Sequence, residues 1–241
     1  LIPILLGFII PILFIIGNVV YEFDRIDFEK VLDLTSNTFI VSLIASSIII
    51  FIAVYFQFLK RIIKNKILTV FNEAISLTYA LPGAVIGLSL IIMFTSFPLK
   101  SEFLIGSFIV LIYAYVMRYM AVGISPLKSS FEKHPSSYDD TAVNLGMGPL
   151  KLFKSIHLPI NKSAIAIAFL ITFVDIIKEL PITLILRPFN FDTLAVQTYE
   201  YAIEEMIPKS SIYSLTIVMM GIILLIFLKK IVNKEIDVSR D

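Results

Sequence analysis

Few residues in this chain could do chemistry, and three of them stand together in an otherwise apolar stretch. Asp175, Lys178 and Glu179 are spaced i, i+3 and i+4, so a continuous helix would carry them on one face. A second polar stretch runs from Asp139 to Gly146 and combines two carboxylates with small side chains. The interpretation of both stretches depends on the elements that carry them.

Most catalytic and metal-binding patterns are missing from the sequence. Cysteine is absent, which excludes disulfides, thiolate metal sites and a thiol nucleophile. The two histidines, His134 and His157, have no cysteine neighbours, and we expect no metal site there. No Ser-His-Asp or zinc-protease spacing occurs, and no G-x-x-x-x-G-K-[ST] loop is present to cradle ATP phosphates. We therefore expect a chain that is not an enzyme and that carries no cofactor.

The composition is that of an integral membrane protein. Of 241 residues, 58% are hydrophobic and 16% are charged, and the mean hydropathy is +0.92. Soluble domains average about a quarter charged residues. A soluble chain of this length could not bury so much apolar surface, and no hydrophilic stretch is long enough for a soluble domain. The predicted fold class is all-α and polytopic.

Uncharged runs predict where the chain crosses the bilayer, because the hydrocarbon core needs roughly 20 apolar residues in a helix. Four runs carry no charge, and two are interrupted by ionisable residues. In chain order the runs are Leu1–Val20, Thr35–Leu59, Ala74–Leu99, about Phe103–Leu127 with Arg118, about Ile160–Leu186 with the three residues above, and Ser210–Leu228. We expect about six transmembrane helices in a single domain, 1–241. Pro82-Gly83 is expected to bend the third or to allow close helix packing, and Pro181 to kink or interrupt the fifth.

Lysine and arginine counts in alternate loops predict the orientation. Fourteen of these cations fall on one side of the membrane and five on the other, so the richer side and both ends of the chain are expected to be cytoplasmic. The outer loops also carry ten carboxylates against their five cations. An acidic outer face could favour cations, and the alternative is an ordinary solvated rim. The chain opens with Leu1 and not with Met, so we expect sequence upstream.

The spans give Asp175, Lys178 and Glu179 a membrane context. Ionisable residues inside a span usually face a bundle interior or a wet cavity, because exposing them to lipid is costly. We interpret the three residues as a candidate translocation path. The alternative is a self-satisfying cluster near the outer interface, in which Lys178 neutralises one of the carboxylates.

The inner hydrophilic stretch, about 128–162, is typical of two short helices joined by a hinge. Asp139 and Asp140 fall in the first turn of the first helix, where carboxylates favour the positive end of the dipole. Gly146 stands where a helix C-cap needs a positive φ. Pro149 suits the first turn of a second helix, about Leu150–Ile156, which Pro159 is expected to end.

The first of these short helices is amphipathic. Tyr138, Ala142 and Leu145 fall at i, i+4 and i+7, on one face of the helix. A small amphipathic helix held outside the membrane suits docking into a groove of a partner protein. The alternative is a helix that lies on the lipid surface.

The same stretch resembles the EAA loop of binding-protein-dependent ABC importer permeases. Asp140, Thr141 and Ala142 occupy the E-A-A places, Gly146 that of the glycine, and Leu158-Pro159 that of the closing pair. Asp140 replaces the usual Glu, and Val143 stands where a basic residue is common. The resemblance implies the type I permease fold and a coupling loop that docks into an ATP-binding subunit. The loop residues it assigns are Asp139, Asp140, Thr141, Ala142, Leu145, Gly146, Leu158 and Pro159.

Two further stretches are similar to the ferric-iron branch of this family. The first is Tyr79-Ala80-Leu81-Pro82-Gly83-Ala84-Val85 in the third span. The second begins at Val174-Asp175-Ile176-Ile177-Lys178-Glu179-Leu180-Pro181 and continues with Leu186-Arg187-Pro188-Phe189-Asn190-Phe191-Asp192-Thr193-Leu194-Ala195. In that branch two homologous halves are usually fused, and this chain looks like the second half.

The resemblance implies a permease that translocates a substrate, ferric iron, across a bacterial inner membrane. The implied partners are ATP-binding cassette ATPase subunits, a periplasmic substrate-binding protein, a second permease half and the lipid bilayer, with no nucleic acid. Sulfate, molybdate, thiamine or polyamine importers share the EAA loop and remain alternatives for the cargo. A stand-alone secondary transporter or channel is the alternative from another class.

Overall fold

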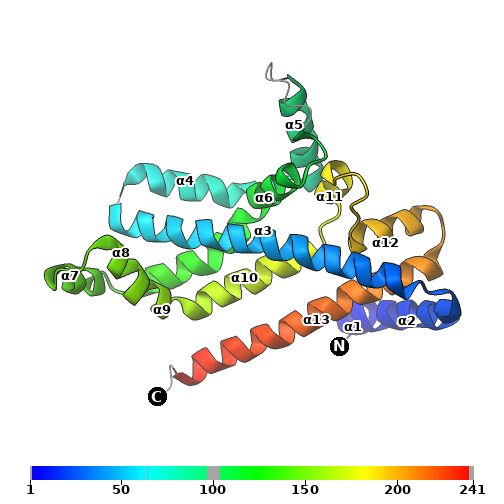
Figure 1. Ribbon diagram of the computed structural model, residues 1–241. Helices are drawn as coiled ribbons and strands as arrows, with labels where there is room; N and C mark the ends of the chain where they lie inside the picture. The colour runs from blue at the N-terminus through cyan, green and yellow to red at the C-terminus, as the bar shows by residue number, and fades with distance from the viewer. Residues whose placement is uncertain (1, 64, 97–103, 239–241) are drawn as a thin grey trace. The chain divides into compact units, whose positions relative to one another are not determined.

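A computed structural model describes residues 2–63, 65–96 and 104–238, and the chain is helical over these ranges, with no strand (Figure 1). This confirms the all-α prediction. Two π-helical turns, η1 (Leu5–Ile9) and η5 (Phe153–His157), and two 3-10 turns, η2 (Phe23–Arg25) and η3 (Thr78–Ala80), join the α-helices. The α-helices are α1 (Ile2–Ile4), α2 (Ile10–Glu22), α3 (Phe28–Ile63), α4 (Lys66–Leu77), α5 (Gly83–Ser96), α6 (Phe108–Lys133), α7 (Ser137–Asn144), α8 (Pro149–Leu152), α9 (Leu158–Ile160), α10 (Lys162–Ile177), α11 (Pro181–Leu186), α12 (Leu194–Ile203) and α13 (Ile207–Val238).

The predicted membrane spans correspond to long helices or to bent pairs of helices. Among the described residues, four helical stretches are long and apolar enough to cross a bilayer, or up to six if each of two bent pairs forms one span. The four are Ile2–Arg25, Phe28–Ile63, Phe108–Lys133 and Ile207–Val232. Leu1, the end of the run Ala74–Leu99 and the start of the run Phe103–Leu127 lie outside the described residues.

Both predicted proline breaks are present. The helix of the third span ends at Ala80 and restarts at Gly83, on the far side of Pro82. In the fifth span α10 ends at Ile177 and α11 begins with Pro181 in its first turn. Proline has no N–H to donate and its ring clashes with the preceding turn, so each helix stops before it.

Arg118 on α6 supports the first of these breaks. Its Nη1 donates to the carbonyl of Leu81 at 2.7 Å, and its guanidinium carbon lies 5.8 Å from the ring centre of Tyr79 and 5.7 Å from that of Tyr119. The carbonyl of Leu81, which lies in the break just before Pro82, therefore has a side-chain donor. Arg118 interrupts an apolar run in the sequence because it serves this backbone break.

The chain divides into two compact units. The first consists of Leu1–Leu43, Gly83–Ala114 and Val174–Leu224, and the second of Ile44–Pro82, Tyr115–Phe173 and Leu225–Asp241. In the first unit a core of Val31, Leu34, Leu194 and Tyr213 joins α3, α12 and α13. In the second unit Phe58, Phe131, Ala142 and Leu152 join α3, α6, α7 and α8.

Glycines allow helices to approach closely in each unit. A Cβ on Gly123 of α6 would lie 2.7 Å from Cγ2 of Ile49, a fully buried residue of α3. A Cβ on Gly87 of α5 would lie 3.1 Å from Cγ2 of Ile185 on α11. Small residues at such crossings allow close van der Waals packing, which drives helix association in lipid, where the hydrophobic effect between helices is absent.

Candidate functional site

The loop between α6 and α10 contains the short helices that the sequence predicts. Helix α7 begins at Ser137, and Asp139 and Asp140 lie in its first turn as expected. Helix α8 begins with Pro149 and runs on through η5 and α9, and the core residues Ala142 and Leu152 pack α7 against α8 (Figure 1). The loop is thus a folded part of the second unit, packed on an apolar core that it shares with α3 and α6.

The hinge between α7 and α8 is a Schellman motif. Gly146 has φ +77°, which confirms the predicted positive φ. Its N–H donates to the carbonyl of Val143 at 2.9 Å, and the N–H of Met147 donates to the carbonyl of Ala142 at 3.0 Å. Met147 then packs against the core that contains Ala142. This pair of bonds satisfies the last carbonyls of α7 and requires a left-handed residue at Gly146.

The prediction that Pro159 ends the second helix is wrong. The helical path continues through Pro159 to Ile160, because this proline lies in the first turn of α9, where its missing N–H is not needed. The chain bends instead at Asn161, where the helices on either side meet at 72°. The side chain of this fully buried residue donates to the carbonyl of His157 at 2.8 Å and accepts from Ser130 Oγ at 2.7 Å.

A charged network fastens the start of α7 to α3. Arg61 Nε donates to Asp139 Oδ2 at 2.6 Å, and its other nitrogens donate to the carbonyls of Phe131, His134 and Pro135. These three carbonyls lie at the end of α6 and in the turn to α7. The guanidinium fork of one residue on α3 thereby fixes both the end of α6 and the start of α7.

His157 completes this network from the other side. Its Nε2 lies 2.8 Å from Asp139 Oδ1, and its ring stacks on Phe131 at 5.4 Å between centres and contacts Phe58 at 5.3 Å. Burial lowers the pKa of His157 below its ordinary value, although the hydrogen bond and charge of Asp139 act in the opposite direction. The neutral imidazole leaves Arg61 to balance the charge of Asp139.

The predicted loop residues therefore divide into two groups. Asp139 is committed to Arg61 and His157, and Ala142 is 2% exposed in the core of the loop, so both residues shape the loop. Asp140 and Thr141 are exposed, and Leu145 is 72% exposed. The exposed residues are the ones available to a partner.

A shallow hollow lies beside the exposed face of α7. Its lining combines the outer side of α7 with the end of the α8–α9 path, and it is almost entirely apolar. The lining residues are Tyr138, Thr141, Ala142, Leu145, Met147, Ile156 and Ile160. This confirms that Tyr138, Ala142 and Leu145 share one face. Leu158 and Pro159 lie between the lining residues Ile156 and Ile160 in the chain. Leu158 is partly buried, and Pro159 is exposed.

The sequence predicts one shared helix face for Asp175, Lys178 and Glu179, and the structure differs from that prediction. Helix α10 ends at Ile177, so Glu179 lies in the break before Pro181. Lys178 Nζ pairs with Asp175 Oδ1 at 2.8 Å. Glu179 is 6% exposed, and its Oε1 accepts from the N–H of Ile182 at 3.1 Å. Its carboxylate thus caps the first turn of α11.

The stretch from Arg187 to Ala195 also forms internal contacts. Arg187 pairs with Asp192 and, at 2.8 Å, with Glu200 of α12. Thr193 caps α12, and the N–H of Leu194 donates to Thr38 Oγ1 on α3 at 2.9 Å. These bonds hold the α11–α12 connection against α3 within the first unit.

The described ranges contain no group of three or more histidine, aspartate or glutamate residues arranged to hold a metal ion. The residues that sequence reasoning missed are Arg61, His157, Ser130 and Asn161. Arg61 had been counted only as a loop cation, and nothing within a few residues of it signals a carboxylate partner at Asp139. His157 could have been found from the stretch Ile156-His157-Leu158-Pro159, because a histidine between apolar residues next to a loop core needs a polar partner.

Comparison with known proteins relates the chain to importer permeases. Over 205 residues, 85% of this chain, it is 28% identical to the "Fe(3+)-transport system permease protein FbpB 2" of Haemophilus influenzae. Over 83 residues, 34% of the chain, it is 32% identical to the "Maltose/maltodextrin transport system permease protein MalG" of Escherichia coli K12. The chain matches 40% of the length of the first protein and 28% of the second. No protein-family model matches it.

These similarities confirm the expected relationship to the permeases of ABC importers. The match to the Fe(3+) permease covers far more of this chain than the matches to maltose permeases, which confirms the resemblance to the ferric-iron type. The helical architecture with its candidate spans is consistent with such a permease.

We predict that Arg61→Lys loosens the loop although it keeps the positive charge. An ammonium group cannot reproduce the fork that joins Asp139 to three carbonyls. We expect trypsin to cleave the purified protein after Lys151 about tenfold faster, which corresponds to a loss of about 1.4 kcal/mol against local opening. Fragment masses from limited proteolysis measure the rate.

Lys60→Gln is the matched control, because the neighbouring Lys60 has only a single 3.4 Å ion pair with the exposed Glu132. It should leave the cleavage rate at Lys151 nearly unchanged. Equal rates in the two variants would contradict a fastening role for Arg61.

Proposed function

We propose that this chain, a homologue of ABC importer permeases, forms half of the transmembrane pathway of an ATP-driven importer in a bacterial inner membrane. The observation that carries the proposal is the folded loop between α6 and α10. It presents an exposed apolar face beside a hollow, and a fixed network holds it in place. The chain has no loop to cradle ATP phosphates, so separate ATPase subunits supply the energy.

The docking face for the ATPase is the outer side of α7. Tyr138 is 48% exposed and Leu145 is 72% exposed, and with Thr141 they border the hollow. An amphipathic helix of this kind binds by laying its apolar face into a groove. Because Arg61 and His157 hold Asp139, a push on α7 is transmitted to α3 and η5.

The other partners follow from the proposed role. A periplasmic binding protein delivers the substrate, and six helices form half a pathway, so a second permease half completes it. ATP binding and hydrolysis then switch the pathway between outward and inward access. The cytoplasmic side is the one that carries α7 and both ends of this chain, because its loops hold most of the cations.

A labelling experiment tests this orientation, since the chain contains no cysteine of its own. We predict that a cysteine at Phe189, which is 94% exposed between α11 and α12, reacts with an impermeant maleimide in intact cells. A cysteine at the exposed Ser129 near the end of α6 should react only after the cytoplasmic face is opened. The reverse pattern would put α7 on the wrong side for an ATPase.

The hinge offers a matched pair of glycines for a test of coupling. Gly146 has φ +77° and Gly148 has φ −71°, and a Cβ on either would meet no described atom within 4 Å. We predict that Gly146→Val stops transport in a protein that still inserts, because a β-branched residue at positive φ costs about 1 kcal/mol or more and misdirects the exit from α7. Gly148→Val should retain transport. Uptake and membrane content measure both variants.

Docking itself is measured by co-purification of the ATPase. Leu145→Glu places a charge on the exposed face and should lower the amount of bound ATPase. Ala142→Glu is a poorer probe, because Ala142 is buried in the loop core and the charge would unfold the loop. Wild-type amounts of ATPase with Leu145→Glu, together with transport by Gly146→Val, would refute the docking role.

Ferric iron is the proposed cargo, and the similarity to the Fe(3+)-transport permease supports it. The motif residues that resemble the ferric-iron branch are engaged in internal bonds, Glu179 with α11 and Arg187 with Asp192 and Glu200. A ferric site also needs several hard oxygen ligands. The binding protein therefore supplies most of the selectivity for the cargo, and the permease supplies a passage.

We predict that deletion of the gene lowers uptake of labelled ferric iron and growth under iron limitation. Unchanged uptake in a strain without a redundant system would exclude iron and leave the importer role intact. Sulfate, molybdate, thiamine or polyamine would then be the cargoes to assay. Import that persists without any ATPase subunit would instead favour a stand-alone secondary transporter or channel.

Two substitutions at Glu179 test in the iron-uptake assay whether its carboxylate lines the path or caps α11. Glu179→Gln keeps an oxygen that can accept from Ile182 and removes only the charge, whereas Glu179→Ala removes both. If the carboxylate lines the path, Glu179→Gln lowers iron uptake with normal insertion. If its role is to cap α11, only Glu179→Ala lowers uptake, and it also lowers thermal stability.

A further inference from the structure

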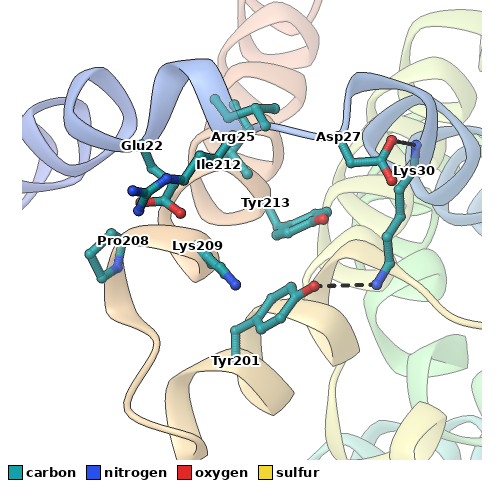
Figure 2. A pocket seen from close by; sticks show the side chains of 10 residues that line it. Glu22, Arg25, Asp27, Lys30, Tyr201, Pro208, Lys209, Ile212 and Tyr213 are labelled. Atoms are coloured by element: carbon teal, nitrogen blue, oxygen red, sulfur yellow. Dashed lines mark hydrogen bonds and ion pairs between the residues drawn. The ribbon is translucent and has the colours of Figure 1, made fainter.

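A cavity of about 220 Å³ lies in the first unit, where α2 ends and α3 and α13 begin. Figure 2 shows its lining, which comes from the α2–α3 turn, from α12 and from the first turns of α13. Two of the lining side chains are held in place by packing. Tyr201 and Tyr213 stack at 5.7 Å between ring centres, and Tyr213 belongs to the core of this unit. None of these residues belongs to the α6–α10 loop or to the candidate path.

Two lysines supply positive charge to this cavity. Lys30 Nζ lies 3.4 Å from the hydroxyl of Tyr201 and 5.3 Å from the centre of its ring. The amine of Lys209 points into the space between Tyr201 and the α2–α3 turn (Figure 2). Within the described ranges, Lys209 has no hydrogen bond or ion pair. Both ammonium groups therefore have donors left for a ligand.

The carboxylates of the cavity are already engaged. Glu22, whose side chain is 7% exposed, lies 3.7 Å from Arg25. Asp27 Oδ1 accepts from the backbone N–H of Lys30 at 3.0 Å, in the first turn of α3. Arg25 balances one carboxylate, and the helix N-terminus stabilises the other. The two lysines thus leave the cavity suited to an anion.

The cavity lies at the level where three candidate spans meet the water. The spans Ile2–Arg25, Phe28–Ile63 and Ile207–Val232 all end or begin beside it. Aromatic side chains surround this level, with Tyr21 77%, Phe23 57% and Phe28 51% exposed. Exposed aromatic rings at span ends mark the membrane–water interface, which is also the depth of the lipid phosphates.

We propose that this cavity binds a phosphate group, namely that of a phospholipid headgroup at the interface. Lys30 and Lys209 donate to the phosphate oxygens, and the Tyr201 hydroxyl adds a further donor. A bound headgroup there joins the ends of three spans, so lipid binding stabilises the first unit. The proposal does not depend on the cargo or on the ATPase.

Thermal unfolding of the purified protein in an uncharged detergent tests the site. Phosphatidylglycerol should raise the Tm of the wild type, and diacylglycerol, which lacks the phosphate, should not. We expect Lys209→Gln to lose at least half of the Tm shift and the double variant with Lys30→Gln to lose nearly all of it. Lys133→Gln, which removes an exposed cation at the end of α6, should keep the full shift and controls for general attraction to anionic lipid.

A parallel titration with inorganic phosphate identifies the source of the group. An equal Tm shift with the same dependence on Lys209 supports the phosphate site and assigns the ligand to solution. Because Lys209 has no bond within the described residues to lose, its replacement tests binding without disturbing the fold, whereas Lys30 also holds Tyr201. Equal shifts in Lys209→Gln and Lys133→Gln, or an equal shift with diacylglycerol, would overturn the proposal.

Discussion

Backbone polar groups inside a membrane cannot rely on water, and this constraint governs how the helices of this protein are broken. At two breaks within the predicted spans, and at a third where the α6–α10 loop meets α10, a polar side chain bonds to a backbone group. Arg118 donates to the carbonyl of Leu81, Asn161 donates to the carbonyl of His157, and Glu179 accepts from the N–H of Ile182. The bond of Glu179 is buried, and loss of its carboxylate would leave the N–H of Ile182 unsatisfied at a cost on the order of 1–3 kcal/mol.

This requirement changes the meaning of ionisable residues in the apolar stretches. A carboxylate within a span suggests a cargo ligand, yet Glu179 is buried as a cap and Asp175 pairs with Lys178. The same holds for Arg187, which pairs with Asp192 and Glu200. Internal bonding of this kind suits a passage whose selectivity comes from a separate binding protein, as proposed for an importer.

Outside the spans, a few polar side chains also fix the loop between α6 and α10. One guanidinium, that of Arg61, binds a carboxylate and three carbonyls, and the neutral ring of His157 occupies the second oxygen of Asp139. These bonds hold the shape of the loop and leave its outer face exposed, as the proposed docking role requires. The cavity with Lys30 and Lys209 is the opposite case, because its ammonium groups retain donors for a ligand.

The sequence by itself determined the features that depend on a few neighbouring residues. Uncharged runs located the spans, the missing donors of Pro82 and Pro181 located two breaks, and Gly146 marked a positive φ. Only the tertiary structure decided which polar groups meet. The pair of Arg61 with Asp139 joins residues far apart in the chain, and the burial of Ala142 depends on three other helices. Backbone preferences act over one turn of helix, whereas a side chain's partner is chosen by the packing of segments whose spacing in sequence carries no signal.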